Sequence, residues 1–134
     1  MLTSIARSFT KKRYNAADYV KIGEYNTFNK VVYPCDTYNP TGKPGGGVVS
    51  SSKLIGRLEE VSADLLLKKK LITVGYFLDI NHVKPATFGK NIKYETKVVG
   101  VDGNKITFDT VATDVNDGTK YGFGKHVRAI IGIE

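Results

Sequence analysis

Residues 50–69 read SSSKLIGRLEEVSADLLLKK, which has the features of one amphipathic helix. A serine ahead of an apolar run is a favoured N-cap, because its hydroxyl accepts a hydrogen bond from a free N–H of the first turn. At about 100° per residue, one stripe of the helix contains Leu54, Leu58, Val61 and Leu65. The stretch therefore predicts a helix from about Lys53 to Lys69 with one buried face.

One carboxylate of this helix stands apart from the other charged residues. The charged face opposite the apolar stripe, which we expect to be exposed, contains Lys53, Arg57, Glu60, Asp64 and Lys68. Glu59 lies roughly 140° from the centre of that face, beside apolar positions. A carboxylate on the apolar side of a helix must find a partner or stay protonated. Glu59 is therefore a candidate functional residue, and an interior ion pair with Arg128 or a lysine is the structural alternative.

Strand patterns lie on both sides of the helix. Residues 25–32 are rich in aromatic and β-branched residues, whereas residues 34–47 contain only loop signals, including a Gly-Gly-Gly run without phosphate-loop spacing. Residues 72–80 alternate apolar and other residues, which predicts one long strand whose apolar face, Ile72, Val74, Tyr76, Leu78 and Ile80, continues to His82. Strands over 92–101, 105–114 and 119–133 follow, separated by Asp-Gly-Asn and Asn-Asp-Gly turns.

This order of elements predicts an α+β protein with the hotdog fold, an antiparallel sheet wrapped around one long central helix. The apolar stripe of a lone helix needs a curved sheet to cover it. Such a sheet leaves unpaired edges, so we expect two chains to pair side by side as a homodimer. Residues 1–17 are interpreted as a basic N-terminal arm and residues 18–134 as the domain.

Length and composition exclude several classes of protein. The chain has 134 residues, enough for one domain with its own core, and its apolar runs are too short to span a membrane. Its single cysteine, Cys35, and its two histidines, His82 and His126, form no cluster at metal-ligand spacing, so we expect no bound metal. The net charge of +7 is spread along the chain without interleaved aromatic residues, which argues against nucleic-acid binding.

The first seventeen residues have the composition of a mitochondrial targeting segment. They contain four basic residues and no acidic residue, and Leu2, Ile5 and Phe9 fall roughly on one helical face. The expected location is therefore the mitochondrion, with the cytoplasm as the alternative.

Four motifs in order resemble the fluoroacetyl-CoA thioesterase-like family of hotdog proteins. They are Val48–Glu59, Thr73–Gly75, Asn81-His82 and Gly122–Ala129, and the resemblance extends from about Gly23 to the C-terminus. It implies that Ser51, Glu59 and His82 form the catalytic set, with serine where the type enzyme has threonine. It also implies that Gly75 lies beside the acyl site.

The resemblance gives Arg128, on the last strand, a place in the substrate-binding part of the site. It also implies that the site is built at a dimer interface, where Glu59, or a water that it activates, attacks the thioester and His82 acts as acid or base. Structural alternatives remain for two of these residues. Ser51 could be only a helix cap, and His82 could be a satisfied residue at a strand end.

Two functions follow from these features. The first is hydrolysis of a short or medium acyl-CoA, without a cofactor, since coenzyme A enters only as part of the substrate. The second is a non-catalytic hotdog subunit with a structural or acyl-binding role in a larger assembly. A hotdog dehydratase is disfavoured, because no hydratase motif surrounds His82.

Overall fold

The computed structural model describes residues 14–43 and 46–134. The predicted targeting segment therefore lies, up to Arg13, outside the described residues. Residues 14–18 pack against the domain: the short 3-10 helix η1 (Ala16–Asp18) begins with a fully buried alanine, whose N–H donates to the Gly103 carbonyl at 2.7 Å. Within the described residues, no helix is long and apolar enough to cross a membrane.

The central helix, α2, spans Ser51–Leu67 and confirms the predicted helix, beginning two residues earlier than expected. Its N-cap is Ser50, whose side chain accepts a hydrogen bond from Lys53 N at 3.3 Å. The predicted apolar stripe is buried, with Leu54, Leu58 and Val61 fully inaccessible to solvent. Burial of this stripe, rather than helix propensity alone, is what stabilises a helix of this length.

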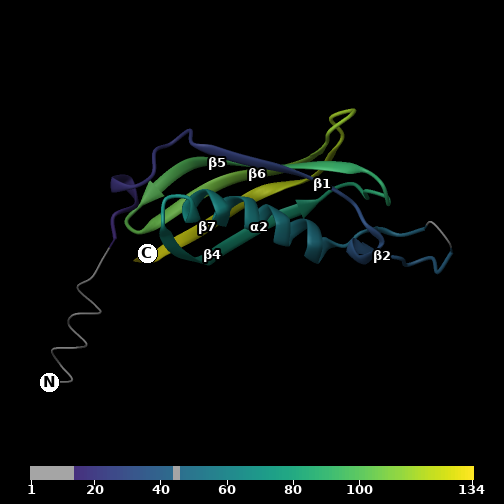
Figure 1. The fold of residues 1–134 in the computed structure, drawn as a ribbon, viewed down its shortest axis with the longest axis horizontal. Helices are drawn as coiled ribbons and strands as arrows, with labels where there is room; N and C mark the ends of the chain where they lie inside the picture. The colour runs from purple at the N-terminus through teal and green to yellow at the C-terminus, as the bar shows by residue number, and fades with distance from the viewer. Residues whose placement is uncertain (1–13, 44–45) are drawn as a thin grey trace, which may run out of the picture.

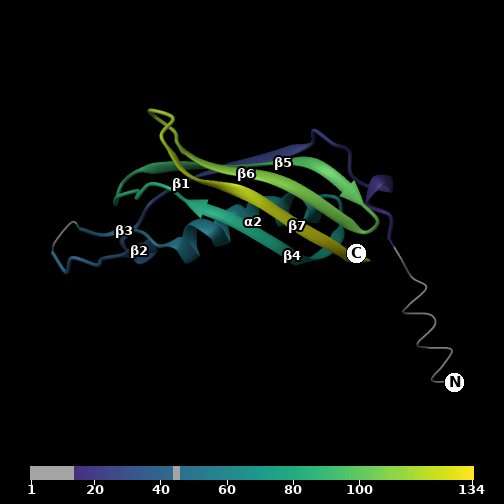
Figure 2. The same cartoon turned by 180° about the vertical axis from the view of Figure 1, so that it is seen from behind.

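The sheet has five antiparallel strands in the order β1-β5-β6-β7-β4. Their bounds are Tyr25–Val31 for β1, Asn91–Asp102 for β5, Lys105–Asp114 for β6, Lys120–Ile133 for β7 and Leu71–His82 for β4. Helix α2 lies across one face of this sheet (Figure 1), and the view from behind shows the strands without a helix in front of them (Figure 2). The hotdog fold predicted from the sequence is confirmed.

The core between helix and sheet is divided by a polar belt. One apolar cluster packs under the first half of α2 and includes Tyr94, whereas a second packs under its last turns and includes Phe108. Between them, Ser62 Oγ lies 2.7 Å from Thr96 Oγ1, and both side chains are buried. The interface between helix and sheet therefore accommodates polar side chains at the middle of α2, where Glu59 also lies.

The predicted single apolar face of β4 is wrong, because the strand is bulged. Its pairing with β7 skips Tyr76 between Gly75 and Phe77, whereas the earlier shift, between Ile72 and Thr73, skips Ile131 of β7 instead. An extra residue in a strand moves all following side chains to the opposite face. As a result, Ile72 and Val74 are exposed at 43% and 45%, whereas His82 is half-buried against the helix side of the sheet.

Residues 34–43 and 46–49 form a small lobe before the helix rather than an unstructured loop. It contains the 3-10 helix η2 (Pro34–Asp36) and two short paired strands, β2 (Thr37–Tyr38) and β3 (Val48–Val49). The lobe extends beyond the N-terminal end of α2 (Figure 1). Arg57, predicted to be exposed, is buried because Asp36 of this lobe pairs with it at 2.7 Å.

Candidate active site

Ser51 and His82 meet at the N-terminal end of α2. Ser51 is the first residue of the helix and His82 the last residue of β4, and Ser51 Oγ lies 3.0 Å from His82 Nδ1. Because Ser50 caps the helix, the Ser51 hydroxyl is not used as the cap. This geometry therefore contradicts the alternative in which Ser51 is only a helix cap.

The second ring nitrogen of His82, Nε2, is buried and has no hydrogen-bond partner among the described residues. An unsatisfied buried polar atom of this kind costs about 1–3 kcal/mol. Such atoms are uncommon and are frequently found where a group serves catalysis or binding. His82 therefore keeps one ring nitrogen without a protein partner, in addition to the one that contacts Ser51.

Glu59 belongs to a second cluster, at the middle of the helix. Its Oε2 atom lies 3.5 Å from Arg128 Nη1 and 3.7 Å from His126 Nε2, both on β7. The Glu59 side chain is 43% exposed, whereas those of His126 and Arg128 are about 1% and 10% exposed. The carboxylate thus has a buried cationic partner on one side and solvent on the other.

Arg128 is held by contacts within the protein. Its Nε donates to Thr73 Oγ1 at 2.8 Å and its Nη2 to the Thr73 carbonyl at 3.1 Å, which leaves Nη1 for Glu59. Burial lowers the pKa of Arg128, with Glu59 opposing this effect, but an arginine stays protonated at physiological pH. These contacts support a role for Arg128 in holding Glu59.

The charge state of His126 follows from its burial. Burial, assisted by the positive charge of Arg128, lowers the pKa of His126 to about 4. The imidazole is therefore neutral at physiological pH, and Glu59 faces one cation, Arg128, and one neutral ring. Sequence reasoning did not include His126 in the catalytic set, although its spacing from Arg128 on one strand places both side chains on the same face.

Gly75 of β4 makes room for Glu59. A Cβ atom at this position would lie 2.9 Å from Glu59 Oε2, closer than real contacts of this kind. Beside it a hollow of about 230 Å³ opens between helix and β4, lined by Glu59, Gly75, Tyr76, Phe77, Leu78 and His126. Glu59 is therefore not sealed into an ion pair, since a small ligand could reach its carboxylate.

The structure brings together part of the predicted set within one chain. Ser51 and His82 are in contact, but Glu59 makes no hydrogen bond or ion pair with either of them among the described residues. Glu59 follows Ser51 by eight residues, a separation of about 12 Å along a helix. Two half-sites result, the Ser51–His82 pair and the cluster of Glu59, His126 and Arg128.

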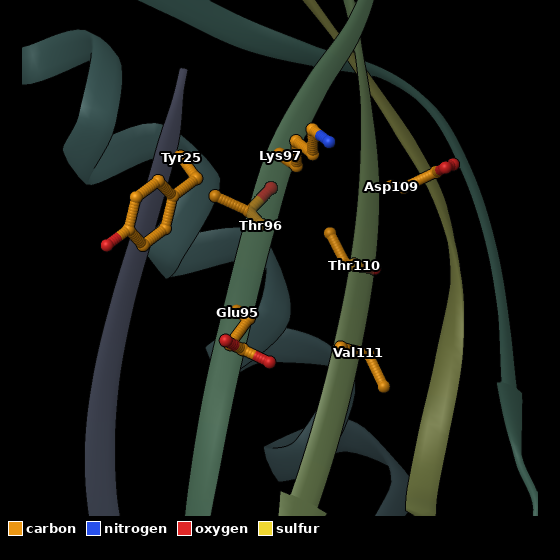
Figure 3. Close-up of a pocket in the computed structure, with 7 residues that line it drawn as sticks. All are labelled: Tyr25, Glu95, Thr96, Lys97, Asp109, Thr110 and Val111. Atoms are coloured by element: carbon orange, nitrogen blue, oxygen red, sulfur yellow. The ribbon is translucent and has the colours of Figure 1, made fainter. Parts of the chain in front are cut away.

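A second hollow lies on the other side of the sheet, without a serine or histidine in its lining. It has a volume of about 310 Å³ on the sheet face opposite α2 and is lined by Tyr25, Glu95, Thr96, Lys97, Asp109, Thr110 and Val111. Figure 3 shows these side chains on the neighbouring strands β1, β5 and β6, with the helix behind the sheet. Neither histidine nor serine lines it, so the half-sites beside α2 remain the candidate active site.

Within residues 14–43 and 46–134, no group of three or more His, Cys, Asp or Glu residues is placed to hold a metal.

An antiparallel sheet packed on one helix defines a protein of the hotdog fold, and this one has a serine–histidine pair at the helix start and a carboxylate at its middle. Over residues 32–134 the chain matches the family described as fluoroacetyl-CoA-specific thioesterase. The chain belongs to this family. No curated protein matches it.

Solved structures agree on the fold. The fluoroacetyl-CoA thioesterase FlK superposes with a TM-score of 0.71 at 19% identity, covering 83% of this chain and 87% of that chain. A hot-dog-like protein from Thermanaerovibrio acidaminovorans gives a TM-score of 0.75 at 19% identity, covering 87% of each chain. The E. coli PaaI protein from the phenylacetic acid degradation operon gives 0.70 at 12% identity, covering 81% of this chain and 74% of that chain.

Proposed function

We propose that this protein hydrolyses short or medium acyl-CoA thioesters to the free acid and coenzyme A. The observation that carries the proposal is Glu59, a half-exposed carboxylate held by Arg128 beside a hollow at the helix–sheet junction. A carboxylate fixed in this way is suited to act as a general base toward a water molecule. Membership of a thioesterase family supports the same reaction.

The proposed reaction adds one water across the C–S bond. Glu59 takes a proton from water, whose oxygen attacks the thioester carbonyl carbon. The C–S bond then breaks, and the leaving sulfur takes up that proton as the thiol of coenzyme A. Negative charge develops on the carbonyl oxygen during attack, and hydrogen-bond donors placed there lower the barrier.

The start of α2 offers such donors. The first N–H groups of a helix lack partners within it and favour negative charge. Ser50 satisfies the N–H of Lys53, which leaves the N–H groups of Ser51 and Ser52 to face the carbonyl oxygen. In this proposal the Ser51–His82 pair lies at the same place and orients the thioester, or relays the proton taken from water to the leaving sulfur.

The two half-sites would be joined in a homodimer. Strand β4 is a sheet edge, and its side chains Tyr76 and Phe77 are 62% and 52% exposed. Pairing two β4 edges would cover these apolar groups and add the missing strand neighbour. It would also let Glu59 of one chain meet Ser51 and His82 of the other, which one chain by itself does not achieve.

The test is to measure hydrolysis of an acyl-CoA series from acetyl to decanoyl, with fluoroacetyl-CoA included. The measured quantity is the free thiol that hydrolysis releases. Glu59→Gln should lower kcat by at least about 100-fold, the contribution typical of general acid–base catalysis. Glu60→Gln is the matched control, since Glu60 is the next residue of the same helix and is exposed; it should leave kcat unchanged. Absence of turnover, or turnover indifferent to Glu59→Gln, would remove this proposal and favour a non-catalytic subunit.

A further inference from the structure

Asp36, outside the helix, holds the start of α2 at two points. Its carboxylate Oδ1 accepts a hydrogen bond from Arg57 Nη2 at 2.7 Å. Its backbone carbonyl accepts another from Ser50 N at 2.9 Å. Ser50 is the N-cap, and Arg57 follows it by about two helical turns. Asp36 therefore binds the residue directly before Ser51 and also the second turn after it.

The Asp36–Arg57 pair is buried and charged. The side chains are 3% and 9% exposed, and Asp36 Oδ2 also accepts a hydrogen bond from Tyr33 N at 3.0 Å. Burial by itself would raise the pKa of Asp36, but hydrogen bonds from Tyr33 and Arg57 outweigh it and lower that pKa. Removing one partner of a buried pair leaves an uncompensated charge, so the contact resists displacement.

The same lobe also holds the segment that follows His82. Val49 N donates to the Ala86 carbonyl at 2.7 Å, and Val48 forms an isolated bridge with Thr87. Thus the residues immediately before Ser51 are bound on one side to Asp36 and on the other to the chain just beyond His82. The relative position of Ser51 and His82 depends on this lobe.

We propose that Asp36 and Arg57 are positioning residues for the Ser51–His82 pair. They hold the first turns of α2 so that Ser51 Oγ stays within hydrogen-bond distance of His82 Nδ1. A displacement of the turn by about 1 Å would break that 3.0 Å contact. The catalytic part of this inference rests on the proposed function, in which the pair acts in thioester hydrolysis.

The direct test measures the hydrogen bond between Ser51 and His82. The imidazole ¹⁵N and ¹H resonances of His82 report its hydrogen bond, and the chain has two histidines, so a His126→Asn variant assigns them. In Asp36→Asn we expect the His82 resonances to move toward their positions in Ser51→Ala. Arg57→Lys, which keeps the charge but loses the planar fork, should move them in the same direction by less.

The matched control removes a buried hydrogen bond from the middle of the same helix. Thr96→Val deletes the hydroxyl that faces Ser62 at 2.7 Å and touches neither the N-cap nor Asp36. It should lower the melting temperature without moving the His82 resonances. If Thr96→Val shifts these resonances as far as Asp36→Asn does, or if neither Asp36→Asn nor Arg57→Lys shifts them, the positioning role is refuted.

Turnover supplies the second readout. In Asp36→Asn the kcat for the best acyl-CoA should fall by about 10- to 100-fold, as expected for misplaced catalytic groups, with KM changed less than kcat. Equal kcat in wild type and Asp36→Asn would overturn the catalytic consequence. A wild-type protein without turnover would refute the proposed function instead, while the resonances of His82 still decide whether Asp36 and Arg57 position it.

Discussion

Gly75 shows how a single missing side chain creates the environment of Glu59. A methyl group at this position would lie 2.9 Å from Glu59 Oε2 and 3.9 Å from both Arg128 Nη1 and His126 Nε2. The carboxylate would have to move away from β4, and the hollow beside it would shrink. We expect Gly75→Ala to lower kcat/KM for acyl-CoA hydrolysis by about 10- to 100-fold while the protein stays folded.

The control for this substitution is Gly132→Ala, on β7. There a Cβ would meet Ile72 Cδ1 at 3.5 Å, an ordinary contact. Both variants add the same methyl group to a strand, so general effects on the sheet are matched. Equal kcat/KM in Gly75→Ala and wild type would mean that Glu59 does not need its present position.

His126 predicts a pH dependence of stability. Its pKa is about 4 in the folded protein, against an ordinary value of about 6.5 in the unfolded chain. Between these values the unfolded state binds more protons, so stability rises with pH and falls as the pH drops below about 6.5. The loss between pH 7 and pH 5 from this residue should be roughly 2 kcal/mol.

Denaturant unfolding at several pH values between 7 and 5 measures this effect. His126→Asn has no imidazole to titrate, so its free energy of unfolding should change less over this range than that of the wild type. The charged groups facing the ring are Arg128 and Glu59, and both are retained in the variant. Parallel curves for the two proteins would show that His126 is protonated in the folded state at pH 5.

At the scale of elements, the sequence predicted those features that depend on local periodicity, namely the helix and the strands. The helix around Leu54 to Leu66 and the meander of long strands were predicted correctly, because alternation and turn residues are read from neighbouring positions. The face to which each β4 side chain points was not predicted, because the bulge at Tyr76 depends on how β4 pairs with β7. The burial of Arg57 was missed for the same reason, because its partner Asp36 is 21 residues away in the chain.

The candidate site also has a part that could be predicted from the sequence and a part that could not. Glu59 was singled out from its place on the helix, and the Ser51 and His82 pairing was anticipated from a family resemblance rather than from spacing. The contact of Glu59 with His126 and Arg128 depends on how α2 crosses β7, which no local pattern encodes. Two residues on alternate positions of the last strand, one basic and one imidazole, were the available signal.

At the scale of the whole molecule, the separation of the two half-sites makes a sharp prediction about assembly. An antiparallel pairing of two β4 edges runs the Gly75 half of one strand toward the His82 end of the other, so Glu59 of one chain would approach Ser51 and His82 of its partner. Ser51→Ala and Glu59→Gln should then each be inactive alone. Mixed dimers would restore one complete site, built from the serine of one chain and the glutamate of the other.

Mixing the two variants at equal concentration, after reversible dissociation, gives mixed dimers in half of the population, each with one intact site of two. The expected recovery is about a quarter of wild-type activity. A sample that mixes Glu59→Gln with a Ser51→Ala/Glu59→Gln double variant is the control and should remain inactive, because no chain in it supplies the glutamate. If each chain instead held a whole site of its own, mixing the single variants would restore nothing, and the β4 edge would need another explanation for its exposed Tyr76 and Phe77.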